Sequence, residues 1–210
     1  MNKGSDRLIA YFGYGSLVNL ATLATPYRHA VPARLKGWRR HWQSRPGDGW
    51  PERALLSVHR DNACEIHGML VFDGASSLPS LDERERHYDR VPLTPQDISL
   101  ACNKAPEMLQ SLGHADFFVY VGRAQQAGKP PLLQSYLHTV MDGFLASHGE
   151  EGLSAFMRTT AGFDREILED LHAPHYPRMT PMAEARRRRF DRMLREAGVR
   201  FAGDPAADAE

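Results

Sequence analysis

Strand-like and helix-like patterns occupy different halves of this chain, and this separation constrains the fold more than any other feature. Short runs rich in apolar, aromatic and β-branched residues lie in the first 122 residues, at 5–12, 33–43, 54–59, 66–72 and 117–122. After the Gly-Lys-Pro-Pro break at 128–131, amphipathic helix patterns follow at 132–147, 151–159 and 182–197. Segregated strands and helices are typical of α+β proteins rather than of alternating βαβ units. We therefore expect a mixed β-sheet or open barrel flanked by helices, with a helical C-terminal segment.

Turns, short helices, a loop and a tail complete the expected organisation. Residues 54–59 and 66–72 are predicted to form a hairpin that turns through residues 60–63. Helical character is expected at 17–24 and at 80–89, where Pro92 limits the helix. Residues 45–51, with two prolines and two glycines, indicate a loop, and the small, acidic tail 202–210 is expected to fray. No repeat or linker divides residues 1–210, so a single domain is expected.

Composition excludes several classes of protein. The 42% hydrophobic and 25% charged residues are close to the globular average and exclude wholesale disorder. The 26 Lys and Arg are balanced by 26 Asp and Glu, so no generic nucleic-acid coat is expected. No apolar run approaches a membrane span, and no signal peptide or disulfide framework is visible with only Cys64 and Cys102. These features predict a soluble, cytoplasmic protein with neither nucleic acid nor membrane as a partner.

The segment Gly13-Tyr14-Gly15-Ser16 follows a predicted strand and precedes a predicted helix. A dinucleotide-binding fingerprint would need a third glycine where Val18 stands and an acid about 20 residues on, but no Asp or Glu occurs between Asp6 and Asp48. The G-x-S-x-G context of a hydrolase nucleophile is also absent around Ser16. Glycines that allow close backbone approach, with N–H groups leading into a helix, would suit an anion cradle, and an ordinary strand–helix turn stays open as the alternative.

Three other polar clusters have simpler interpretations. The charged stretch 81–90 has the pattern of a solvated helix face with i,i+4 ion pairs. His172 and His175 are separated by a proline and lack the Cys or acid cluster that would complete a metal site. The four arginines at 186–189 share their helix with acids and few aromatics, which favours a solvated or partner-facing surface over an RNA site.

Several segments in order resemble the γ-glutamylcyclotransferase superfamily. Residues 12–17, Phe-Gly-Tyr-Gly-Ser-Leu, resemble its N-terminal signature in the form found in ChaC-like members. Residues 33–40 and 66–72 are similar to two of its strands, and residues 81–91 resemble the segment that carries its catalytic glutamate. Pro131, Tyr136, Val140 and Gly143 resemble the start of a later helix. The resemblance spans about residues 8–147, whereas the predicted helical extension 149–201 has no counterpart.

The resemblance implies a reaction and a set of site residues. The α-amine of a γ-glutamyl group attacks its own γ-carbonyl, which forms 5-oxoproline and releases an amine, amino acid or peptide. On this resemblance Glu85 is the catalytic base, and it is no longer only part of a solvated face. The implied substrate-binding residues are Tyr14, Gly15, Ser16, Leu17 and Tyr120, with Tyr136 as a further hydroxyl. The implied chemistry needs no metal, other cofactor or covalent nucleophile, and the partner is a small γ-glutamyl compound.

Two alternatives to a cyclotransferase remain open at this point. A non-catalytic small-molecule-binding or regulatory module would use the same fold and pocket, although the retained Glu85 counts against it. A nucleotide-binding oxidoreductase is disfavoured by the missing glycine and acid described above. The substrate also stays open among glutathione, γ-glutamyl dipeptides and γ-glutamylamines, and with it the leaving group.

Overall fold

The computed structural model describes residues 7–23, 26–44, 53–100, 115–123 and 128–202. Its strands are β1 (Leu8–Gly13), β2 (His29–Ser44), β3 (Ala54–Gly74), β4 (Tyr88–Pro92), β5 (Ile98–Leu100), β6 (Asp116–Gly122), β7 (Leu132–Leu133), β8 (Thr160–Ala161), β9 (Glu166–Leu168) and β10 (Arg200–Phe201). Its α-helices are α1 (Leu78–Arg84), α3 (Gln134–Arg158) and α4 (Glu184–Glu196). Four 3₁₀ turns accompany them in the described chain: η1 (Ser16–Val18), η2 (Leu20–Thr22), η3 (Ala75–Ser77) and η4 (Pro95–Asp97).

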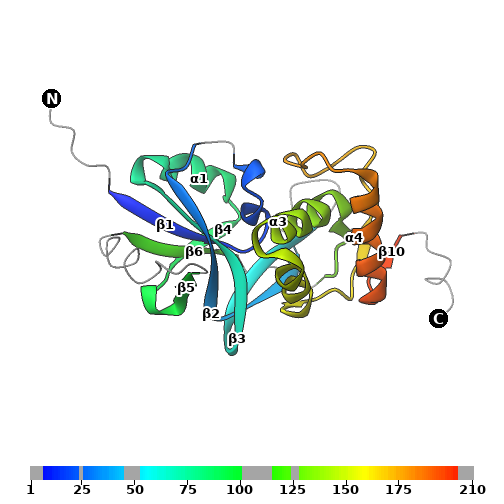
Figure 1. Ribbon diagram of the computed structural model, residues 1–210, viewed down its shortest axis with the longest axis horizontal. Helices are drawn as coiled ribbons and strands as arrows, with labels where there is room; N and C mark the ends of the chain where they lie inside the picture. Colours follow the sequence, from blue (N-terminus) through cyan, green and yellow to red (C-terminus); the bar gives the residue numbers. More distant parts are fainter. Residues whose placement is uncertain (1–6, 24–25, 45–52, 101–114, 124–127, 203–210) are drawn as a thin grey trace.

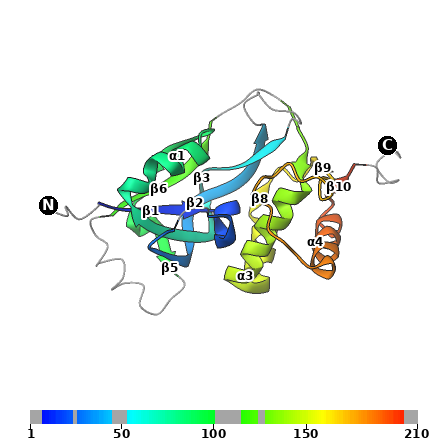
Figure 2. The same cartoon turned by 90° about the horizontal axis from the view of Figure 1, so that it is seen from above.

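A mixed sheet forms one side of the molecule, and α3 and α4 lie together on the other side (Figures 1 and 2). Within the described residues the sheet has seven strands, in the order β4-β6-β1-β3-β2-β5, with β8 paired to β2. β1 runs parallel to β6 and antiparallel to β3, so both kinds of pairing meet at the strand that leads to residues 13–17. A separate three-stranded sheet, β10-β9-β7, joins the C-terminal segment to the start of α3. The predicted α+β class is confirmed.

The predicted hairpin at 54–72 is wrong, because β3 continues through it without reversing. β3, with 21 residues, pairs with β2, which has 16, and the register breaks only between Lys36 and Trp38. Gly37, at φ +80°, lies in that break and adopts a conformation that suits glycine. Across the break, Asp61 accepts a 2.6 Å hydrogen bond from Nε of Arg39. Residues 60–63, which would favour a turn between two short strands, therefore form part of a bulge in a long pair of strands.

The helices predicted at 17–24 and 80–89 are both shorter in the structure than expected. The described part of segment 17–24 forms only the 3₁₀ turns η1 and η2. The helix predicted at 80–89 ends at Arg84, and β4 begins at Tyr88, because this aromatic and β-branched segment pairs with β6. Pro92 is therefore the last residue of a strand rather than the limit of a helix. Glu85 lies in the short connection between α1 and β4.

The C-terminal half agrees well with the helix patterns. The two helices predicted at 132–147 and 151–159 meet in α3, which is interrupted at Gly149 with φ +63°. α4 confirms the helix predicted at 182–197. The extension 149–201 is not purely helical, since β8, β9 and β10 lie within it. No helix in the described ranges is long and apolar enough to cross a membrane. The loop 45–51 and residues 203–210 of the predicted tail lie outside the described residues.

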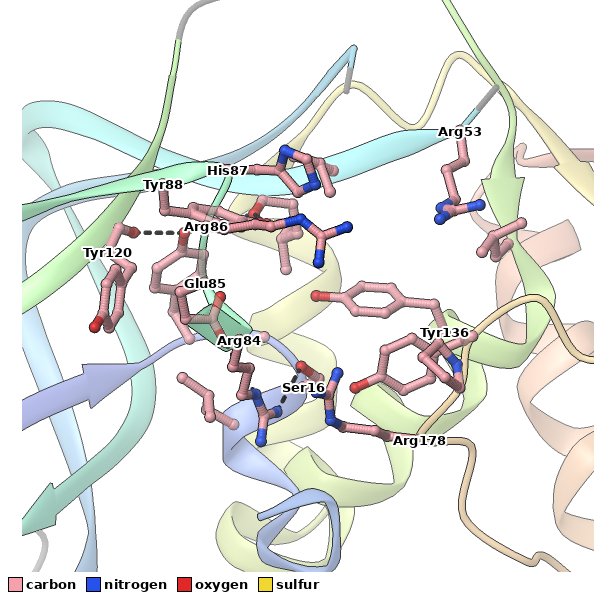
Figure 3. Close-up of a pocket in the computed structure, with 18 of the residues that line it drawn as sticks. Ser16, Arg53, Arg84, Glu85, Arg86, His87, Tyr88, Tyr120, Tyr136 and Arg178 are labelled. Carbon is pink, nitrogen blue, oxygen red and sulfur yellow. Dashed lines mark hydrogen bonds and ion pairs between the residues drawn. The ribbon is translucent and has the colours of Figure 1, made fainter. Parts of the chain in front are cut away.

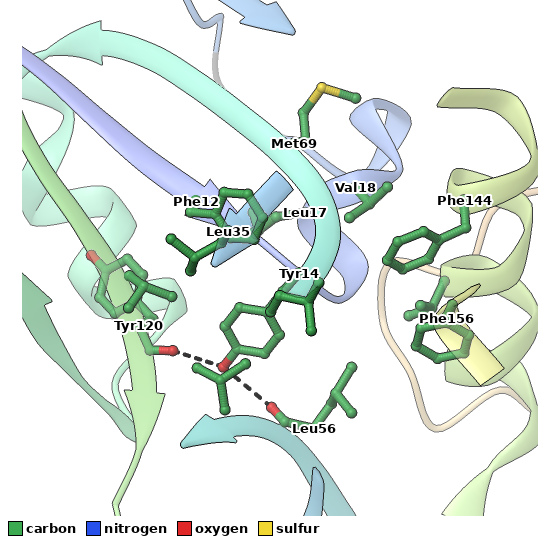
Figure 4. Close-up of a cluster of buried hydrophobic side chains, with 14 of the residues drawn as sticks. Phe12, Tyr14, Leu17, Val18, Leu35, Leu56, Met69, Tyr120, Phe144 and Phe156 are labelled. Atoms are coloured by element: carbon green, nitrogen blue, oxygen red, sulfur yellow. Dashed lines mark hydrogen bonds between the residues drawn. The ribbon is translucent and has the colours of Figure 1, made fainter. Parts of the chain in front are cut away.

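One cluster of buried apolar side chains joins the sheet to α3 and α4. Figure 4 shows part of it, with Phe12 and Leu35 of the sheet on one side and Phe144 and Phe156 of α3 on the other. Gly143 of α3 packs directly on the turns after β1, since a Cβ atom there would lie 2.6 Å from the backbone nitrogen of Asn19. The Asn19 side chain in turn donates to the carbonyl oxygen of Thr139 at 3.0 Å. This contact fixes the loop after β1 against α3.

A buried guanidinium group fixes the other end of α3 to the sheet. Arg40 of β2 is fully buried and donates to the His67 carbonyl at 2.7 Å and to the hydroxyls of Thr159 and Thr160 at 2.6 and 3.0 Å. Its guanidinium carbon lies 5.0 Å from the centre of the Phe144 ring. Burial lowers the pKa of Arg40 to about 9, and the group is held by neutral acceptors and ring faces.

We predict that Gly143→Ala destabilises the fold by roughly 1–3 kcal/mol, because its methyl group must push α3 away from the backbone at Asn19. Urea unfolding followed by circular dichroism measures the change. Ala146→Ser, at an exposed position of the same helix, is the matched control and should change the free energy of unfolding by less than about 0.5 kcal/mol. Equal stability of Gly143→Ala and the wild type would contradict the close contact.

Candidate active site

A cavity of about 490 Å³ opens between the edge of the sheet, the start of α3 and the segment that precedes α4. Its lining includes the loop after β1, the beginning of β3, the α1–β4 connection and residues 175–178. Figure 3 shows the Glu85 carboxylate facing this space, with Ser16, Arg178 and Tyr136 around it. All the site residues that the sequence analysis proposed line this cavity: Tyr14, Gly15, Ser16, Leu17, Glu85, Tyr120 and Tyr136.

Glu85 is a nearly buried carboxylate at the centre of the lining. Its side chain is 14% exposed, and its Oε1 lies 3.0 Å from Nε of Arg84. Burial raises the pKa of Glu85 above the ordinary value, although the positive charges of Arg84 and Arg178 oppose this rise. The carboxylate is thus more basic than an exposed glutamate, which suits a group that accepts a proton near neutral pH.

Arg84 connects Glu85 to the loop after β1. Its Nη1 donates to the Thr22 carbonyl at 2.8 Å and its Nη2 to the Thr22 hydroxyl at 3.1 Å, with the Ser16 hydroxyl 3.5 Å away. The side chain is 10% exposed, so these bonds are shielded from water. Arg84 is a site residue that the sequence analysis missed, because the residues it binds lie more than 60 positions earlier.

The loop at Gly15 is close-packed against the protein itself. Gly15 has φ −129° and ψ −125°, so a positive φ is not the reason for this glycine. A Cβ atom at this position would lie 2.7 Å from the Tyr136 hydroxyl and 3.2 Å from Cδ2 of Leu56. Glycine at 15 therefore leaves room for Tyr136 to reach the loop. Hydrogen bonding from the backbone and hydroxyl of Ser16 opposes the rise that burial causes in the pKa of Tyr136.

The hydroxyls of the two predicted binding tyrosines are used inside the protein. Tyr14 donates to the Tyr120 carbonyl at 2.7 Å, and it also lies 3.5 Å from the Leu56 carbonyl (Figure 4). The Tyr120 hydroxyl donates to Asp82 at 2.7 Å, and Tyr88 donates to the Leu56 carbonyl at 3.0 Å. Burial raises the pKa of Tyr14 and Tyr88, which keeps both neutral. Tyr14 and Tyr120 thus shape the cavity wall; the Tyr14 hydroxyl is bonded to β6, and the Tyr120 hydroxyl is bonded to α1.

The C-terminal extension contributes one wall of the cavity through residues 175–178. Asp170, which is buried, accepts hydrogen bonds from the Ser135 backbone and hydroxyl at 2.8 and 2.6 Å and from the His175 backbone at 2.9 Å. The Tyr176 ring stands perpendicular to that of Tyr136, with centroids 5.0 Å apart. The Tyr176 hydroxyl is buried and has no hydrogen-bond partner among the described residues.

His172 and His175, which the sequence analysis weighed as metal ligands, do not form a metal site with other described residues. His175 lines the cavity next to Tyr176 and Arg178. Across the described part of the chain, no three His, Cys, Asp or Glu side chains gather in a way that could hold a metal ion. The polar groups that line the cavity include the Glu85 carboxylate, several arginine side chains, tyrosine and serine hydroxyls, and the backbone of residues 15–17.

Comparison with known proteins relates this arrangement to solved structures. No protein-family model and no curated protein sequence matches the chain. A structure titled gamma-glutamyl cyclotransferase matches with a TM-score of 0.52 at 14% identity, over 90% of this chain and 99% of that one. An uncharacterised human protein matches with the same values. YkqA of Bacillus subtilis matches with a TM-score of 0.50 at 19% identity, over 72% of this chain and 53% of that one.

The chain has the γ-glutamyl cyclotransferase fold. The resemblance seen in the sequence ended near residue 147, whereas the structural match to the first of these structures covers 90% of the chain. In this structure residues 14–17 and Glu85 line the same cavity. The fold also brings Tyr176 and Arg178 of the extension to that cavity, and no motif in the sequence marked either of them.

We predict that Glu85→Gln becomes increasingly stable relative to the wild type as pH rises. Burial raises the pKa of folded Glu85, so the folded wild type holds this proton more tightly than the unfolded chain. Wild-type stability is therefore lost as pH increases from the ordinary glutamate pKa of about 4.3 through the raised value. Thermal unfolding between pH 4 and pH 8 measures the difference in Tm between the two proteins. A difference that is constant with pH would contradict a raised pKa of Glu85, and a difference that shrinks as pH rises would show that Arg84 outweighs burial.

Proposed function

We propose that this protein is a γ-glutamyl cyclotransferase, which cyclises a γ-glutamyl group to 5-oxoproline and releases an amine, amino acid or peptide. The observation that carries the proposal is the buried carboxylate of Glu85 in the cavity of this fold, at the position where the sequence resemblance expects the catalytic glutamate. The structural neighbour that bears this name supports the fold, and the geometry of the cavity supports the chemistry.

The reaction is intramolecular, and this determines what the protein must supply. The nucleophile is the substrate's α-amine and the electrophile is its own γ-carbonyl, so holding the folded conformer provides much of the rate acceleration. A cavity of about 490 Å³ with close-packed tyrosine walls is suited to select such a conformer. Tyr136, held between Gly15 and Tyr176, and Tyr14, braced on Tyr120, form two of these walls.

Glu85 accepts the proton in the proposed mechanism. The α-ammonium loses a proton to the Glu85 carboxylate, and the free amine attacks the γ-carbonyl to give a tetrahedral intermediate. When the C–N bond to the departing group breaks, Glu85 returns the proton to the leaving nitrogen. The new ring nitrogen then gives its second proton to the regenerated Glu85 carboxylate, which releases it to the departing amine or to water. The raised pKa of Glu85 favours both transfers, because it lies nearer to the pKa values of the amines with which the carboxylate exchanges the proton.

The loop after β1 and the nearby cations stabilise negative charge. Among the backbone N–H groups of residues 15–17, those of Gly15 and Leu17 are the candidates to meet the tetrahedral oxyanion and the α-carboxylate, because the N–H of Ser16 already bonds to Tyr136. Arg178 adds a positive charge close enough to lower the pKa of Glu85. Arg84 is already bonded to Glu85 and Thr22, so its role is to position the carboxylate and the loop.

The proposal is tested by measuring 5-oxoproline from a panel of glutathione, a γ-glutamyl dipeptide, a γ-glutamyl polyamine and γ-glutamyl-ε-lysine. We expect at least one compound to be cyclised and Glu85→Gln to lower its turnover by about a hundredfold or more, since the amide keeps the shape but accepts no proton. Asp89→Asn is the control, because Asp89 is 64% exposed, lies outside the cavity and is paired only on the surface with Arg123.

The outcomes separate the two candidate functions on this fold. Wild-type protein that binds these compounds without producing 5-oxoproline would contradict the enzyme and favour a binding or regulatory module. Full activity of Glu85→Gln would contradict the role of Glu85 even if the wild type is active. Loss of activity in Asp89→Asn as well would indicate a general effect on the α1–β4 connection rather than on the carboxylate.

A further inference from the structure

Two histidine rings meet on the long strand pair β2–β3, at residues that do not line the cavity. His41 of β2 lies opposite Ser57 of β3, so His59, two residues further along β3, is its diagonal neighbour on the same face of the sheet. The Nδ1 atoms of the two rings lie 3.0 Å apart, and the ring centres lie 4.8 Å apart. At this distance the two nitrogens cannot both carry a hydrogen, so at least one ring turns a lone pair toward the other.

Hydrogen bonds beyond the pair determine which ring holds that lone pair. The Gln43 side chain donates through Nε2 to the Arg123 carbonyl at 2.9 Å, and its Oε1 lies 3.1 Å from Nε2 of His41. An amide oxygen only accepts, so the hydrogen of His41 is on Nε2 and the lone pair is on Nδ1. Histidines that bind metals commonly have this arrangement, in which the nitrogen away from the metal donates to an oxygen that fixes the ring.

The separation of the two nitrogens matches that of neighbouring ligands on one metal ion. With both Nδ1 atoms about 2.1 Å from the ion, the usual metal–imidazole length, a separation of 3.0 Å gives an angle of about 90° at the metal. Neighbouring ligands in square-planar and octahedral sites have this angle, whereas the tetrahedral sites typical of zinc need a wider one. Imidazole nitrogens in such geometries favour Cu²⁺ and Ni²⁺.

The two histidines are carried by backbone that the sheet holds in place. β2 pairs with β3 on one side of His41, and on the other side His41 is paired with Ala161 of β8. His59 is paired with Arg39 of β2. Ligands on paired strands keep their spacing better than ligands on loops, so little conformational entropy is lost when a metal binds both rings.

The pair supplies two protein ligands, and solvent would supply the others. Within the described chain, no third His, Cys, Asp or Glu side chain completes a cluster with the two rings. The Asp61 carboxylate, two residues after His59, is already bonded to Arg39 at 2.6 Å. His59 is exposed, so water reaches its side of the pair. A site of this kind binds a metal ion reversibly, with water in the remaining positions.

We propose that His41 and His59 form a binding site for a late divalent transition-metal ion, Cu²⁺ or Ni²⁺, and that Gln43 positions His41 for this role. The bare pair is a hydrogen bond in which Nδ1 of His59 donates to Nδ1 of His41. When the ion binds, His59 gives up the hydrogen on Nδ1 and takes one from water on Nε2, so both rings stay neutral. The ion then joins β2 to β3. The site is independent of the proposed function, because neither histidine lines the cavity.

The test measures metal binding to the full chain without a histidine tag, by calorimetry and thermal unfolding with NiCl₂, CuCl₂ or MgCl₂. We expect Ni²⁺ and Cu²⁺ to bind and to raise the Tm, and Mg²⁺ to do neither because it prefers oxygen ligands. His41→Gln and His59→Gln should each weaken Ni²⁺ binding about a hundredfold, since one imidazole lacks the second, intramolecular contact. Gln43→Leu, which removes the acceptor at similar size, should weaken it about tenfold.

An exposed histidine elsewhere provides the matched control. His172→Gln should bind Ni²⁺ as the wild type does, because His172 is exposed and lies in the segment before α4 rather than on the β2–β3 pair. Electron paramagnetic resonance of the Cu²⁺ complex should show coupling to two imidazole nitrogens in the wild type and to one in His59→Gln. The exposed position of His59 keeps this variant informative even if His41→Gln destabilises the fold.

Three results would overturn the proposal. The first is a wild-type protein whose Tm and calorimetric trace do not respond to Ni²⁺ or Cu²⁺. The second is an affinity for Ni²⁺ that His59→Gln leaves unchanged or that His172→Gln lowers as much, which would place the ion elsewhere. The third is a Cu²⁺ spectrum with a single imidazole nitrogen in the wild type. None of these results bears on the formation of 5-oxoproline, which is measured separately.

Discussion

The guanidinium group of Arg84 holds together the parts of the chain that form the cavity. It joins the carboxylate of Glu85, at the end of α1, to the Thr22 carbonyl and hydroxyl in the turns after β1. Those turns are also pressed against α3 through Gly143 and Asn19. Arg84 therefore connects Glu85, the proposed catalytic residue, to the loop that is proposed to meet the substrate's negative charge. A shift of α1 or of this loop would move the other.

The same arrangement balances the protonation of Glu85. Burial alone would favour the neutral acid, which cannot take a proton from the substrate. Arg84 at 3.0 Å and the charge of Arg178 favour the carboxylate, yet burial remains the larger effect and the pKa stays above the ordinary value. Stronger pairing with the arginines would make the Glu85 carboxylate a weak base, and weaker pairing would leave Glu85 protonated and unable to accept a proton. The site thus costs the folded protein some stability at neutral pH, as is common where a group is positioned for chemistry.

The sequence correctly predicted the strands and helices whose spacing of apolar residues matches the face that they bury. β1, β6 and α4 were predicted within a few residues because their apolar spacing matches the face they bury. The hairpin at 54–72 was wrong because turn-forming residues such as Asp61 and Asn62 are tolerated in a bulge when β2 and β3 pair on both sides of it. Glu85 was singled out by resemblance, since its charged neighbours alone indicate a solvated helix face.

Other site residues depend on contacts between distant parts of the chain. Asp170 positions residues 175–178 by capping α3 at Ser135, 35 positions earlier, and no local pattern marks such a partner. Tyr176 and Arg178 follow two histidines and a proline that suggested at most a weak metal site. Their place in the cavity comes from the pairing of β9 with β7, which returns the extension to the start of α3.

The central claim is that the substrate's own α-amine is the nucleophile and that Glu85 takes its proton. The most direct measurement follows one active γ-glutamyl compound with and without acetylation of that amine, with 5-oxoproline and free glutamate both quantified by mass spectrometry. Competition binding of the acetylated compound shows whether it still enters the cavity. The account predicts 5-oxoproline without free glutamate from the unmodified compound, and no turnover of the acetylated compound at concentrations where it binds. Free glutamate as the product, or turnover of the acetylated compound, would contradict it.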